Sequence, residues 1–452
     1  MKVIIVGGGP AGLFAAYELA DFCDVTIIDK GRDSEKRICP YPNNCKKSCK
    51  PCNVVCGIGG AGLFSDGKII FDTEVGTNLT EIIGLKKNKN LVEKVEKIFS
   101  EYSVFARELT NDEIALLNEI RKKASQADIK FVYTRQAHVG TNNLKDLISK
   151  FKNDLEVRGV EFLCKEEVKD IIPNENKIRT TKGVYKYDKL ILAPGRVGAS
   201  WLEKIVKKLG IKYEYSPIDI GVRVEVSREI TDWITNLVRD MKFHMYLKNK
   251  IFARTFCTCP GGKVTKETHD DFVLVNGYSE KGDPGENTNF AFLIRISLTN
   301  PLSNTNEYGR EVAALANTIG KGKIILQRLG DLRMEKRSKE KHKFNYLVKP
   351  TLDDVVYGDI SLALPGKIIK NIVAGIERLN KVIPGVANDS TLLYAPEIKF
   401  HGLKIKTNKY LETNIKDIYV GGDGAGLSRG IAGAAACGVL IGEGIKKDMK
   451  KK

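Results

Sequence analysis

Hydrophobic positions near the start of the chain follow the pattern of a strand–turn–helix–strand unit. The apolar run over residues 2–6 predicts a buried strand, residues 7–12 are rich in glycine, and residues 13–20 have helical spacing. A second apolar run covers residues 24–29. This β-α-β order has the length of half a Rossmann fold.

The pattern then changes twice along the chain. Residues 79–125 and 144–155 have helical spacing, and residues 160–163 and 187–193 form strand-like runs. From about residue 214 the apolar positions alternate, most clearly in three runs that predict a β-rich second domain: 218–226, 272–278 and 290–297. The end of the chain returns to a strand over 418–420, a glycine-rich turn and an Ala/Gly helix.

Composition sets broad limits on the class of protein. A chain of 452 residues with 42% hydrophobic and 29% charged residues predicts two or three domains with sizeable cores and excludes global disorder. The net charge of +17 suits a polyanionic partner such as a phosphate-bearing cofactor, nucleic acid or an acidic membrane surface. A lysine-covered surface explains the charge equally simply.

Targeting signals are not evident. No basic n-region or small-residue cleavage site precedes the first strand, and no uncharged apolar run approaches the roughly 18 residues of a membrane span. We therefore expect a cytoplasmic protein without a membrane span. In that compartment, ten cysteines favour metal or redox chemistry over disulfide staples.

The first turn carries the fingerprint of a dinucleotide site, Gly7-x-Gly9-x-x-Gly12. The glycines permit a tight turn, close approach of a pyrophosphate and close helix packing, and the helix N-terminus offers N–H groups to the phosphates. Asp29 ends the second strand, where it is placed to bind a ribose diol. The cofactor residues predicted in this part of the chain are Gly7, Gly9, Pro10, Ala11, Gly12, Asp29 and Lys30.

Two later strand-then-glycine elements extend the pattern. The run 187–195 ends in Pro194-Gly195, and the run 418–426 places Gly422-Asp-Gly-Ala-Gly426 after a buried strand. With the first turn, these elements resemble the two-dinucleotide-fold flavoproteins of glutathione-reductase type. The resemblance implies FAD, with Gly195, Gly422, Asp423, Gly424, Ala425 and Gly426 among its contacts. It also implies that Asp423 bonds the ribityl or pyrophosphate region, and that a helix starting at Ala425 points at the flavin pyrimidine end.

A closer resemblance covers nearly the whole chain. The segments 59–68, 219–226, 254–262 and 395–399 are similar to those of a family described only as FAD-dependent dehydrogenases or oxidoreductases with a distinctive C-terminal domain. This implies an α/β fold in which a Rossmann-like FAD-binding domain carries an inserted α+β, β-rich substrate or cap domain. It implies no substrate.

We place the domain boundaries accordingly. The FAD-binding domain is expected in three parts, 1–72 with a Cys-rich loop at 39–56, 131–200, and 401–452 with a basic tail. A helical insertion is expected over 73–130 and the substrate or cap domain over 201–400.

The glycine loop after the cysteines superficially matches a phosphate-binding loop, Gly62-x4-Gly67-Lys68. Ile69 follows where Mg²⁺ binding needs Ser or Thr, so we interpret it instead as a backbone-donor loop near FAD. Its predicted contacts are Gly59, Gly60, Ala61 and Gly62, with Ser65, Asp66 and Lys68 as tentative catalytic residues near the flavin ring. Lys68 would bond the N5 edge or stabilise an anion on the substrate; the alternative is a lysine that caps a turn.

Five cysteines fall within residues 39–56. Cys45, Cys49, Cys52 and Cys56 are the predicted ligands of an Fe–S cluster or zinc ion, with Cys39 as an alternative ligand. Their spacing matches neither standard ferredoxin spacing nor paired zinc knuckles. A redox disulfide, free thiols and inert packing therefore remain open, and a cluster here would serve as an electron relay.

Other candidate side chains lie further along. Cys257-x-Cys259 is a tentative catalytic pair whose disulfide would be strained and readily reduced. His138 is a candidate proton donor or cofactor contact, and Arg223 and Arg254 are candidate clamps for a carboxylate or pyrophosphate. The alternatives are an ordinary hydrogen-bonded histidine and salt-bridged strand charges.

Taken together, the sequence favours an FAD-dependent oxidoreductase that passes electrons through flavin N5 to or from an unidentified small organic substrate. No second GxGxxG is evident, so NAD(P)H as a transient donor or an electron-carrier protein would supply the electrons. Two alternatives are a flavin-dependent RNA-modifying enzyme and a non-catalytic flavin or metal redox sensor. The spread of basic residues without interleaved aromatics disfavours nucleic acid as a partner.

Overall fold

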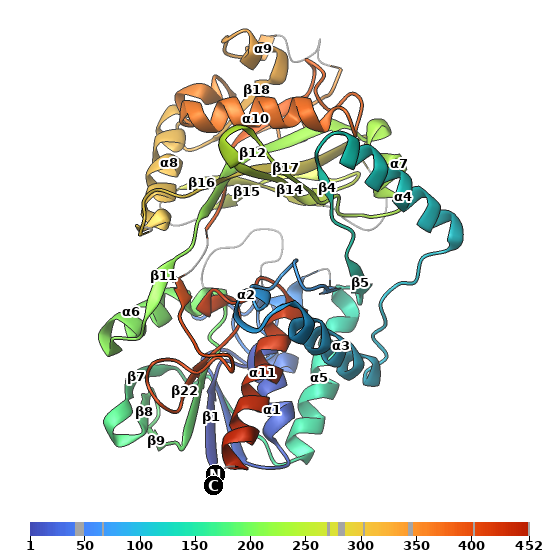
Figure 1. Ribbon diagram of the computed structural model, residues 1–452. Coiled ribbons are helices and arrows are strands. Elements are labelled where there is room, and N and C mark those ends of the chain that lie inside the picture. The colour runs from blue at the N-terminus through green and yellow to red at the C-terminus, as the bar shows by residue number, and fades with distance from the viewer. Residues whose placement is uncertain are drawn as a thin grey trace. The chain divides into compact units, whose positions relative to one another are not determined.

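The computed structural model describes residues 1–40, 49–65, 67–268, 272–278, 285–301, 303–341, 347–400 and 403–450. The chain divides into two compact units (Figure 1). Unit 1 comprises Met1–Glu108, Thr134–Ser216 and Gly402–Lys452, and unit 2 comprises Leu109–Tyr133 and Pro217–His401. Each unit has its own large hydrophobic core.

Unit 1 is built on a five-stranded sheet in which all neighbouring strands run parallel. The strands in spatial order are β22 (Ile418–Val420), β10 (Lys189–Leu192), β1 (Lys2–Val6), β2 (Asp24–Asp29) and β6 (Glu161–Cys164). Their residues are mostly fully buried, as expected for a parallel sheet covered on both faces. This sheet confirms the predicted Rossmann-like α/β class.

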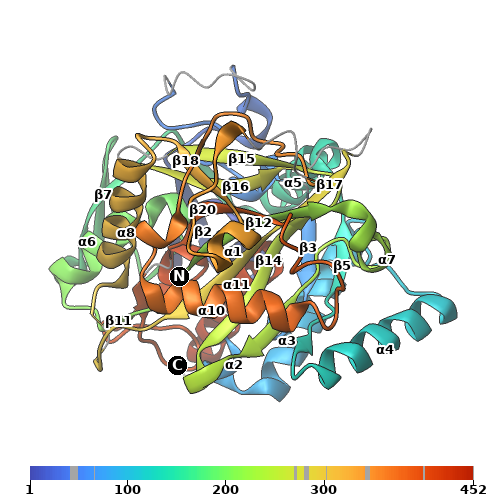
Figure 2. The ribbon, with the colours of Figure 1, turned by 90° about the horizontal axis from the view of Figure 1, so that it is seen from above.

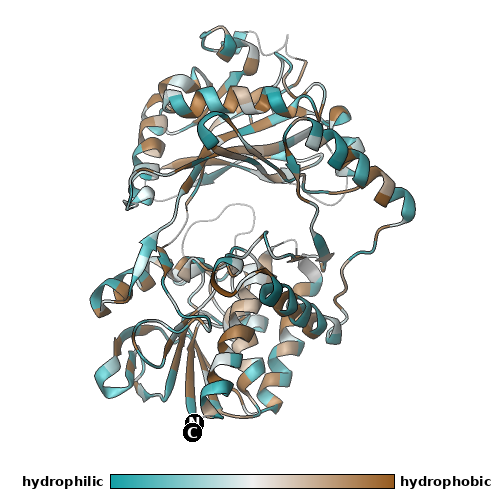
Figure 3. Cartoon of the chain, in the orientation of Figure 1, coloured by the Kyte–Doolittle hydropathy of each residue, from teal (hydrophilic) through white to brown (hydrophobic). Residues whose placement is uncertain are grey.

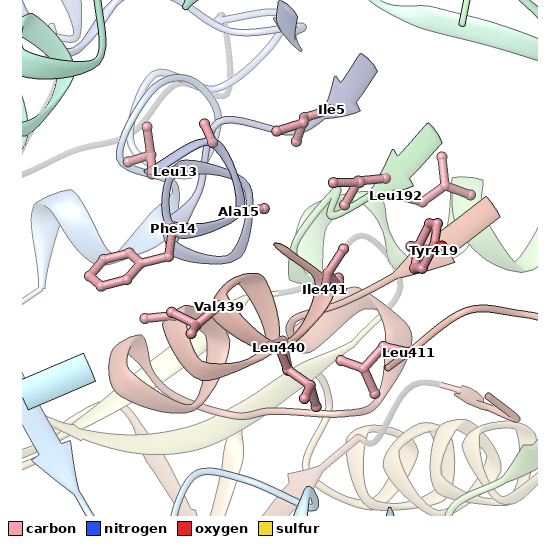
Figure 4. Packing of buried hydrophobic residues seen from close by; sticks show 14 of the residues in the cluster. Ile5, Leu13, Phe14, Ala15, Leu192, Leu411, Tyr419, Val439, Leu440 and Ile441 are labelled. Carbon is pink, nitrogen blue, oxygen red and sulfur yellow. The ribbon is translucent and has the colours of Figure 1, made fainter. Parts of the chain in front are cut away.

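Two helices from opposite ends of the chain lie side by side against this sheet, α1 (Pro10–Leu19) and α11 (Ile431–Met449) (Figures 1 and 4). They approach so closely that a Cβ on Gly438 would lie 2.2 Å from the carbonyl oxygen of Ala11. Phe14 on α1 also stacks on Phe151 with ring centroids 5.0 Å apart. The Ala/Gly composition of α11 is therefore explained by close helix packing in the core.

The remaining elements of unit 1 are short sheets and surrounding helices. They are α2 (Thr80–Ile83), α3 (Leu85–Glu101), α5 (Thr141–Val157), α6 (Ala199–Leu209), the pair β3 (Lys68–Phe71) and β5 (Arg135–His138), the sheet β7 (Val168–Ile172), β8 (Lys177–Thr180) and β9 (Val184–Lys186), and the pair β11 (Tyr213–Tyr215) and β21 (Leu403–Ile405).

Unit 2 is built on an eight-stranded, mostly antiparallel sheet. Its strands in spatial order are β19 (Val355–Tyr357), β18 (Ile324–Arg328), β20 (Leu392–Lys399), β12 (Ile218–Ser227), β17 (Asn287–Ile296), β14 (Phe252–Cys259), β13 (Phe243–Tyr246) and β4 (Lys130–Phe131). A separate hairpin pairs β15 (Lys263–Thr268) with β16 (Val273–Tyr278). The β-rich character predicted from residue 214 onward is thus present.

The helices of unit 2 are α4 (Asn111–Gln126), α7 (Asp232–Thr235), α8 (Thr305–Ile319), α9 (Leu329–Arg333) and α10 (Gly366–Leu379). Figure 2 shows α10 crossing the strands of the sheet, and Gly375 lets this helix approach the ring of Phe292 on β17. The hydropathy colouring of Figure 3 shows helices with one apolar and one polar face. Both observations place the core between sheet and helices.

The units divide the chain differently from the predicted boundaries. The segment 73–130, expected as one helical insertion, is split: α3 packs Phe99 against Phe14 in unit 1, whereas α4 packs Leu117 and Ile120 into the core of unit 2. Residues 201–216, expected in the cap domain, belong to unit 1. Amphipathic spacing reveals that a helix has an apolar face but not which core receives it.

In the part of the chain that the structure describes, no helix is both long enough and apolar enough to cross a membrane.

Candidate functional site

The predicted cofactor residues gather at one edge of the unit 1 sheet. The glycine turns at 7–12, 194–195 and 421–426 follow the carboxyl ends of β1, β10 and β22, which are adjacent or next-adjacent strands. Their contact is direct, because a Cβ on Gly424 would lie 2.5 Å from the carbonyl oxygen of Gly195. This edge is where open parallel sheets bind ligands.

The three fingerprint glycines have different surroundings. A Cβ on Gly7 would lie 2.2 Å from the carbonyl oxygen of Ala193, and one on Gly12 would lie 2.0 Å from that of Gly7. Gly9 is different, since its Cβ would meet only the Cα of Gly60 at 3.8 Å. Gly7 and Gly12 are therefore needed for packing, whereas Gly9 has only an ordinary contact with Gly60 at the start of α1.

The N-terminus of α1 lies at this glycine turn. Gly9 is the N-cap without a side-chain cap, and Pro10 occupies the first turn. The first-turn N–H groups of a helix have no intrahelical acceptor, and the helix dipole adds positive potential there. An uncapped helix N-terminus that begins with Gly9 and has no side chain at its N-cap fits a pyrophosphate group.

The loop 57–62 lies against this helix end. Gly59 donates its N–H to the carbonyl of Gly8 at 2.8 Å, and a Cβ on Gly60 would lie 3.1 Å from the Cα of Gly9. Ala61 is exposed at the start of the short helical turn Ala61–Phe64, and a Cβ on Gly62 would meet Ile431 at the start of α11. The predicted backbone-donor loop therefore does border the dinucleotide turn.

Arg37, which sequence reasoning missed, holds this loop in place. Its side chain is 2% exposed and lies 5.2 Å from the ring centroid of Phe64. Its guanidinium donates to the backbone carbonyls of Asn53 (2.9 Å), Val54 (2.7 Å), Gly57 (3.3 Å), Ile58 (2.8 Å) and Gly60 (2.8 Å). Burial lowers the pKa of Arg37 to about 10. No motif in the sequence distinguishes it from other arginines.

Asp29 and Lys30 lie at the end of β2. Both carboxylate oxygens of Asp29 accept backbone N–H groups, from Gly8 at 2.9 Å and from Gly31 at 2.7 Å. The carboxylate thus tethers the glycine turn to β2 and retains lone pairs for a ribose hydroxyl. Lys30 lies close enough to Cys56 to lower the pKa of that thiol, although burial raises the pKa overall.

Asp423 lies in a polar cluster at the third turn. It accepts from the Ser428 hydroxyl at 2.8 Å and from the Arg196 guanidinium at 3.1 Å. Burial raises the pKa of Asp423, and the charge of Arg196 opposes this. Sequence reasoning missed both partners, although Arg196 directly follows the predicted Gly195.

The helix expected from Ala425 starts later. Asp423–Ala425 is a short 3-10 turn, Gly426 has a φ of +72°, and α11 begins at Ile431 after the uncapped Gly430. A left-handed residue cannot continue a right-handed helix, so the chain first makes a loop. That loop is tied to residues 76–78, where the Asn78 side chain donates to the carbonyl of Gly426 at 3.0 Å.

The tentative catalytic residues around Lys68 occupy one hairpin. Lys68 on β3 pairs directly with His138 on β5, so the two side chains are cross-strand neighbours. The Ser65 hydroxyl donates to the Gly62 carbonyl at 2.7 Å and accepts from the Gly67 N–H, which assigns it a turn-forming role. Asp66 lies outside the described residues.

The nine cysteines that the structure describes are all thiols. Cys39, Cys49 and Cys52 are partly exposed, and Cys56 is buried. Among the described residues, no group of three or more His, Cys, Asp or Glu side chains is arranged to hold a metal ion. Cys45 lies outside those residues, so the predicted four-ligand set is not described in full.

Cys257 and Cys259 belong to unit 2, where they end strand β14. Arg223 is fully buried beside them and is ion-paired with Glu397 at 3.3 Å. Arg254 pairs with Asp219 at 2.7 Å. Both arginines thus have acidic partners within unit 2, which is the salt-bridge alternative to a substrate clamp.

The comparisons with known proteins agree with this geometry. The family model for pyridine nucleotide-disulphide oxidoreductases matches residues 1–196, and the model for the FAD-dependent protein, C-terminal domain-like, matches residues 217–399. A relative from Clostridium beijerinckii, itself described as an uncharacterized protein, is 26% identical over 480 residues, which cover 100% of this chain and 82% of the relative.

Solved structures give a more distant similarity. L-proline dehydrogenase from P. horikoshii is 14% identical with a TM-score of 0.38, covering 99% of this chain and 93% of that one. Glycine oxidase from Geobacillus kaustophilus is 12% identical with a TM-score of 0.37, covering 99% and 95%. Similarities this low do not assign a substrate.

The parallel sheet and its glycine turns define a Rossmann-like dinucleotide-binding domain. The two family matches identify the chain as an FAD-dependent oxidoreductase in which such a domain is joined to an FAD-dependent-protein C-terminal domain. This confirms the family resemblance drawn from the sequence motifs.

Proposed function

We propose that this oxidoreductase passes electrons through flavin N5 to or from a small organic substrate, with the flavin held by the glycine turns of unit 1. The observation that carries the proposal is the uncapped first turn of α1, where Gly9 and Gly60 lie close together without side chains. When bound, FAD supplies the two-electron chemistry, and the protein supplies binding, orientation and electrostatics.

Binding is the proposed task of the sheet edge. The first-turn amides of α1 receive the pyrophosphate, and Asp29 accepts a ribose hydroxyl with the lone pairs that Gly8 and Gly31 leave open. Asp423, oriented by Ser428, accepts a hydroxyl of the ribityl region. Gly195, Gly422, Gly424 and Ala425 line the same edge, where small residues permit close approach.

Orientation and charge are the proposed tasks of the Lys68–His138 pair. The Lys68 ammonium would stabilise negative charge that develops on the substrate, and His138 would hold or release a proton beside it. One backbone hydrogen bond supports this assignment. The Gly67 carbonyl accepts the Val139 N–H at 3.0 Å, which joins the loop after Gly62 to the strand of His138.

Variants of Lys68 test this assignment. Lys68→Met should lower the rate of flavin reduction by a small-molecule donor by about 100-fold, the loss typical of one transition-state donor. Flavin content and melting temperature should stay at wild-type values, and Lys68→Arg should recover part of the rate. Anaerobic stopped-flow reduction with NADH, NADPH and amino-acid or hydroxy-acid donors gives the rates. A wild-type rate in Lys68→Met would refute the role.

The electron source is proposed to be transient NAD(P)H or a carrier protein, and a cysteine-ligated Fe–S cluster or zinc ion in the loop 39–56 stays a hypothesis. No described group of ligands supports it, and Cys45 is not described. Iron and zinc analysis of anaerobically purified protein decides the point. Iron in amounts near the flavin content would support the relay, and absence of both metals would leave thiols.

A further inference from the structure

The strand that carries Cys257 and Cys259 is bulged at these residues. Phe256 pairs with Ala291 and Cys259 with Asn289, so β14 has one more residue than β17 across this interval. Cys257 takes a φ of +50°, which is rare for a residue other than glycine. Bulges of this kind redirect side chains beside functional sites. Here the bulge leaves Cys257 partly exposed and Cys259 buried.

A buried arginine joins the two cysteines. Nη2 of Arg223 donates to the carbonyl of Cys257 at 2.6 Å and contacts Sγ of Cys259 at 3.2 Å. Nε of Arg223 donates to the Asn289 side chain at 2.8 Å. A Cβ on Gly277 would lie 1.8 Å from Nη2 of Arg223, so β16 covers the guanidinium closely. The positive charge is therefore held against the thiol pair.

The bulge has a second anchor on its other side. The carboxylate of Asp240 accepts the Thr258 N–H at 3.0 Å and pairs with Lys242 at 2.5 Å. Thr255 donates its hydroxyl to the Met241 carbonyl at 2.6 Å. Both bonds fix the chain on the two sides of Cys257, which keeps its left-handed backbone in place.

The hydrogen bond between the two cysteines, more than the surrounding charges, makes the pKa values of the two thiols differ. The hydrogen bond from Cys259 lowers the pKa of Cys257 to about 6; burial and the charges of Glu397 and Asp240 oppose this, while Arg223 reinforces it. The pKa of Cys259 is raised by the same hydrogen bond and by burial. Because Cys257 is partly exposed and Cys259 is buried, Cys257 is the thiol that a reagent reaches first, and its lowered pKa favours attack.

Glu397 completes the cluster. Its Oε1 accepts from Arg223 at 3.3 Å and pairs with Lys399 at 3.1 Å. Its Oε2 is buried and has no hydrogen-bond partner among the described residues. A buried acceptor without a partner costs free energy, and a redox or catalytic role is one of the reasons for which such a group is kept.

We propose that Cys257 and Cys259 form a redox-active dithiol in unit 2 that exchanges with a small-molecule disulfide, with Cys257 as the attacking thiolate and Cys259 as the resolving thiol. The proposal does not depend on FAD or on the proposed reaction of unit 1.

The exchange balances in two steps. The Cys257 thiolate attacks one sulfur of the small disulfide, forms a mixed disulfide and releases one small thiolate, which takes the proton of Cys259. The Cys259 thiolate then attacks Sγ of Cys257, the Cys257–Cys259 disulfide forms, and the second small thiolate leaves. The cysteine pair loses two electrons and the small disulfide gains them.

Alkylation at varied pH tests the thiolate assignment. The holoprotein is pulsed with iodoacetamide between pH 4.5 and 9, and the peptide that spans Thr255 and Lys263 is analysed by fragmentation mass spectrometry. Cys257 should react with a midpoint near pH 6, roughly two and a half units below an ordinary thiol. Cys259→Ala, which removes the hydrogen-bond donor, should raise that midpoint by about one unit. An ordinary midpoint in the wild type would overturn the proposal.

Glutathione disulfide tests the exchange. Wild-type holoprotein should form the Cys257–Cys259 disulfide, Cys259→Ser should stop at a glutathione adduct on Cys257, and Cys257→Ser should form neither. Buried Cys437, whose pKa burial raises to about 12, is the unreactive control in every sample. Retained flavin absorbance and circular dichroism show that the variants are folded. An adduct on Cys259 of folded Cys257→Ser, or no reaction of native wild type, would overturn the assigned roles.

Discussion

Each unit of the molecule buries one arginine, and the two have opposite partners. Among the described residues, Arg37 in unit 1 donates only to backbone carbonyls, whereas Arg223 in unit 2 bonds a carboxylate, an amide, a carbonyl and a thiol. Burial lowers the pKa of Arg37 to about 10. Burial also disfavours the charge of Arg223, but Glu397 and the two cysteines together raise its pKa.

The two units therefore form their proposed sites in different ways. In unit 1 the proposed cofactor site is mostly backbone, and one cation holds the loop that borders it. In unit 2 the proposed thiol site is made of side chains from β12, β14, β17 and β20, and one cation joins them. Arg37 therefore acts on loop conformation, and Arg223 acts on charge.

The largest effect is expected for Arg223→Ala. This change leaves the buried Glu397 carboxylate without its Arg223 partner while Lys399 stays beside it, which should lower the free energy of unfolding of unit 2 by about 3–5 kcal/mol. The double variant Arg223→Ala with Glu397→Gln should recover part of the loss. Urea unfolding of both variants measures the difference. Equal losses in the single and the double variant would show that charge is not the cause.

Arg37→Ala is expected to have the second-largest effect on stability. Five carbonyls lose their donor, so the free energy of unfolding of unit 1 should fall by about 4 kcal/mol and bound flavin should be lost. Arg37→Lys keeps the charge with fewer donors and should retain part of the flavin. Flavin released per protein and urea unfolding measure the two effects. Full flavin occupancy in Arg37→Ala would break the link between this side chain and the loop.

Gly12→Ala should have a smaller effect on folding. Its Cβ would lie 2.0 Å from the carbonyl oxygen of Gly7, so the helix and turn must separate at a cost of about 3 kcal/mol. The matched control is Gly366→Ala at the start of α10, where a Cβ meets nothing within 4 Å. Thermal unfolding compares them. A Gly12→Ala variant as stable as the control would contradict the packing role.

Asp423→Asn is expected to have the smallest effect. Because burial raises the pKa of Asp423 in the folded protein, its stabilising contribution exists at low pH and is lost as pH rises through the folded pKa. The flavin-free variant should therefore be more stable than flavin-free wild type at neutral pH. This difference in stability should disappear below the ordinary pKa of aspartate. Melting temperatures from pH 3 to 8 measure this. A difference in melting temperature that grows toward low pH would contradict a raised pKa of Asp423.

Much of unit 1 could be predicted from the sequence because its information is local. Gly7, Gly9 and Gly12 lie between a strand and a helix, and Asp423 follows a buried strand, so each site residue is identified by its own neighbours. The role of Arg37 could not be predicted, since its acceptors are backbone carbonyls that carry no sequence signal. The split of 73–130 was likewise hidden, because helical spacing does not name the receiving core.

Only part of the proposed thiol site of unit 2 could be predicted from the sequence. The Cys257-x-Cys259 spacing draws attention by itself. Its charge environment depends on Arg223 and Glu397, which strand register brings together from positions 174 residues apart. Long-range pairing of this kind is not encoded in any short motif.

Gly9→Val probes the proposed binding of the FAD pyrophosphate at the N-terminus of α1. Gly9 has a φ of −82°, and its Cβ would have ordinary contacts, so valine should leave the fold intact. Its methyl groups should obstruct the approach of a phosphate to the first-turn N–H groups of α1. Fluorescence titration of the flavin-free proteins with FAD gives the dissociation constants. We predict binding weakened by about 100-fold, the loss of two charge-assisted hydrogen bonds, with an unchanged melting temperature of the flavin-free protein. Wild-type affinity for FAD in Gly9→Val would contradict pyrophosphate binding at the N-terminus of α1.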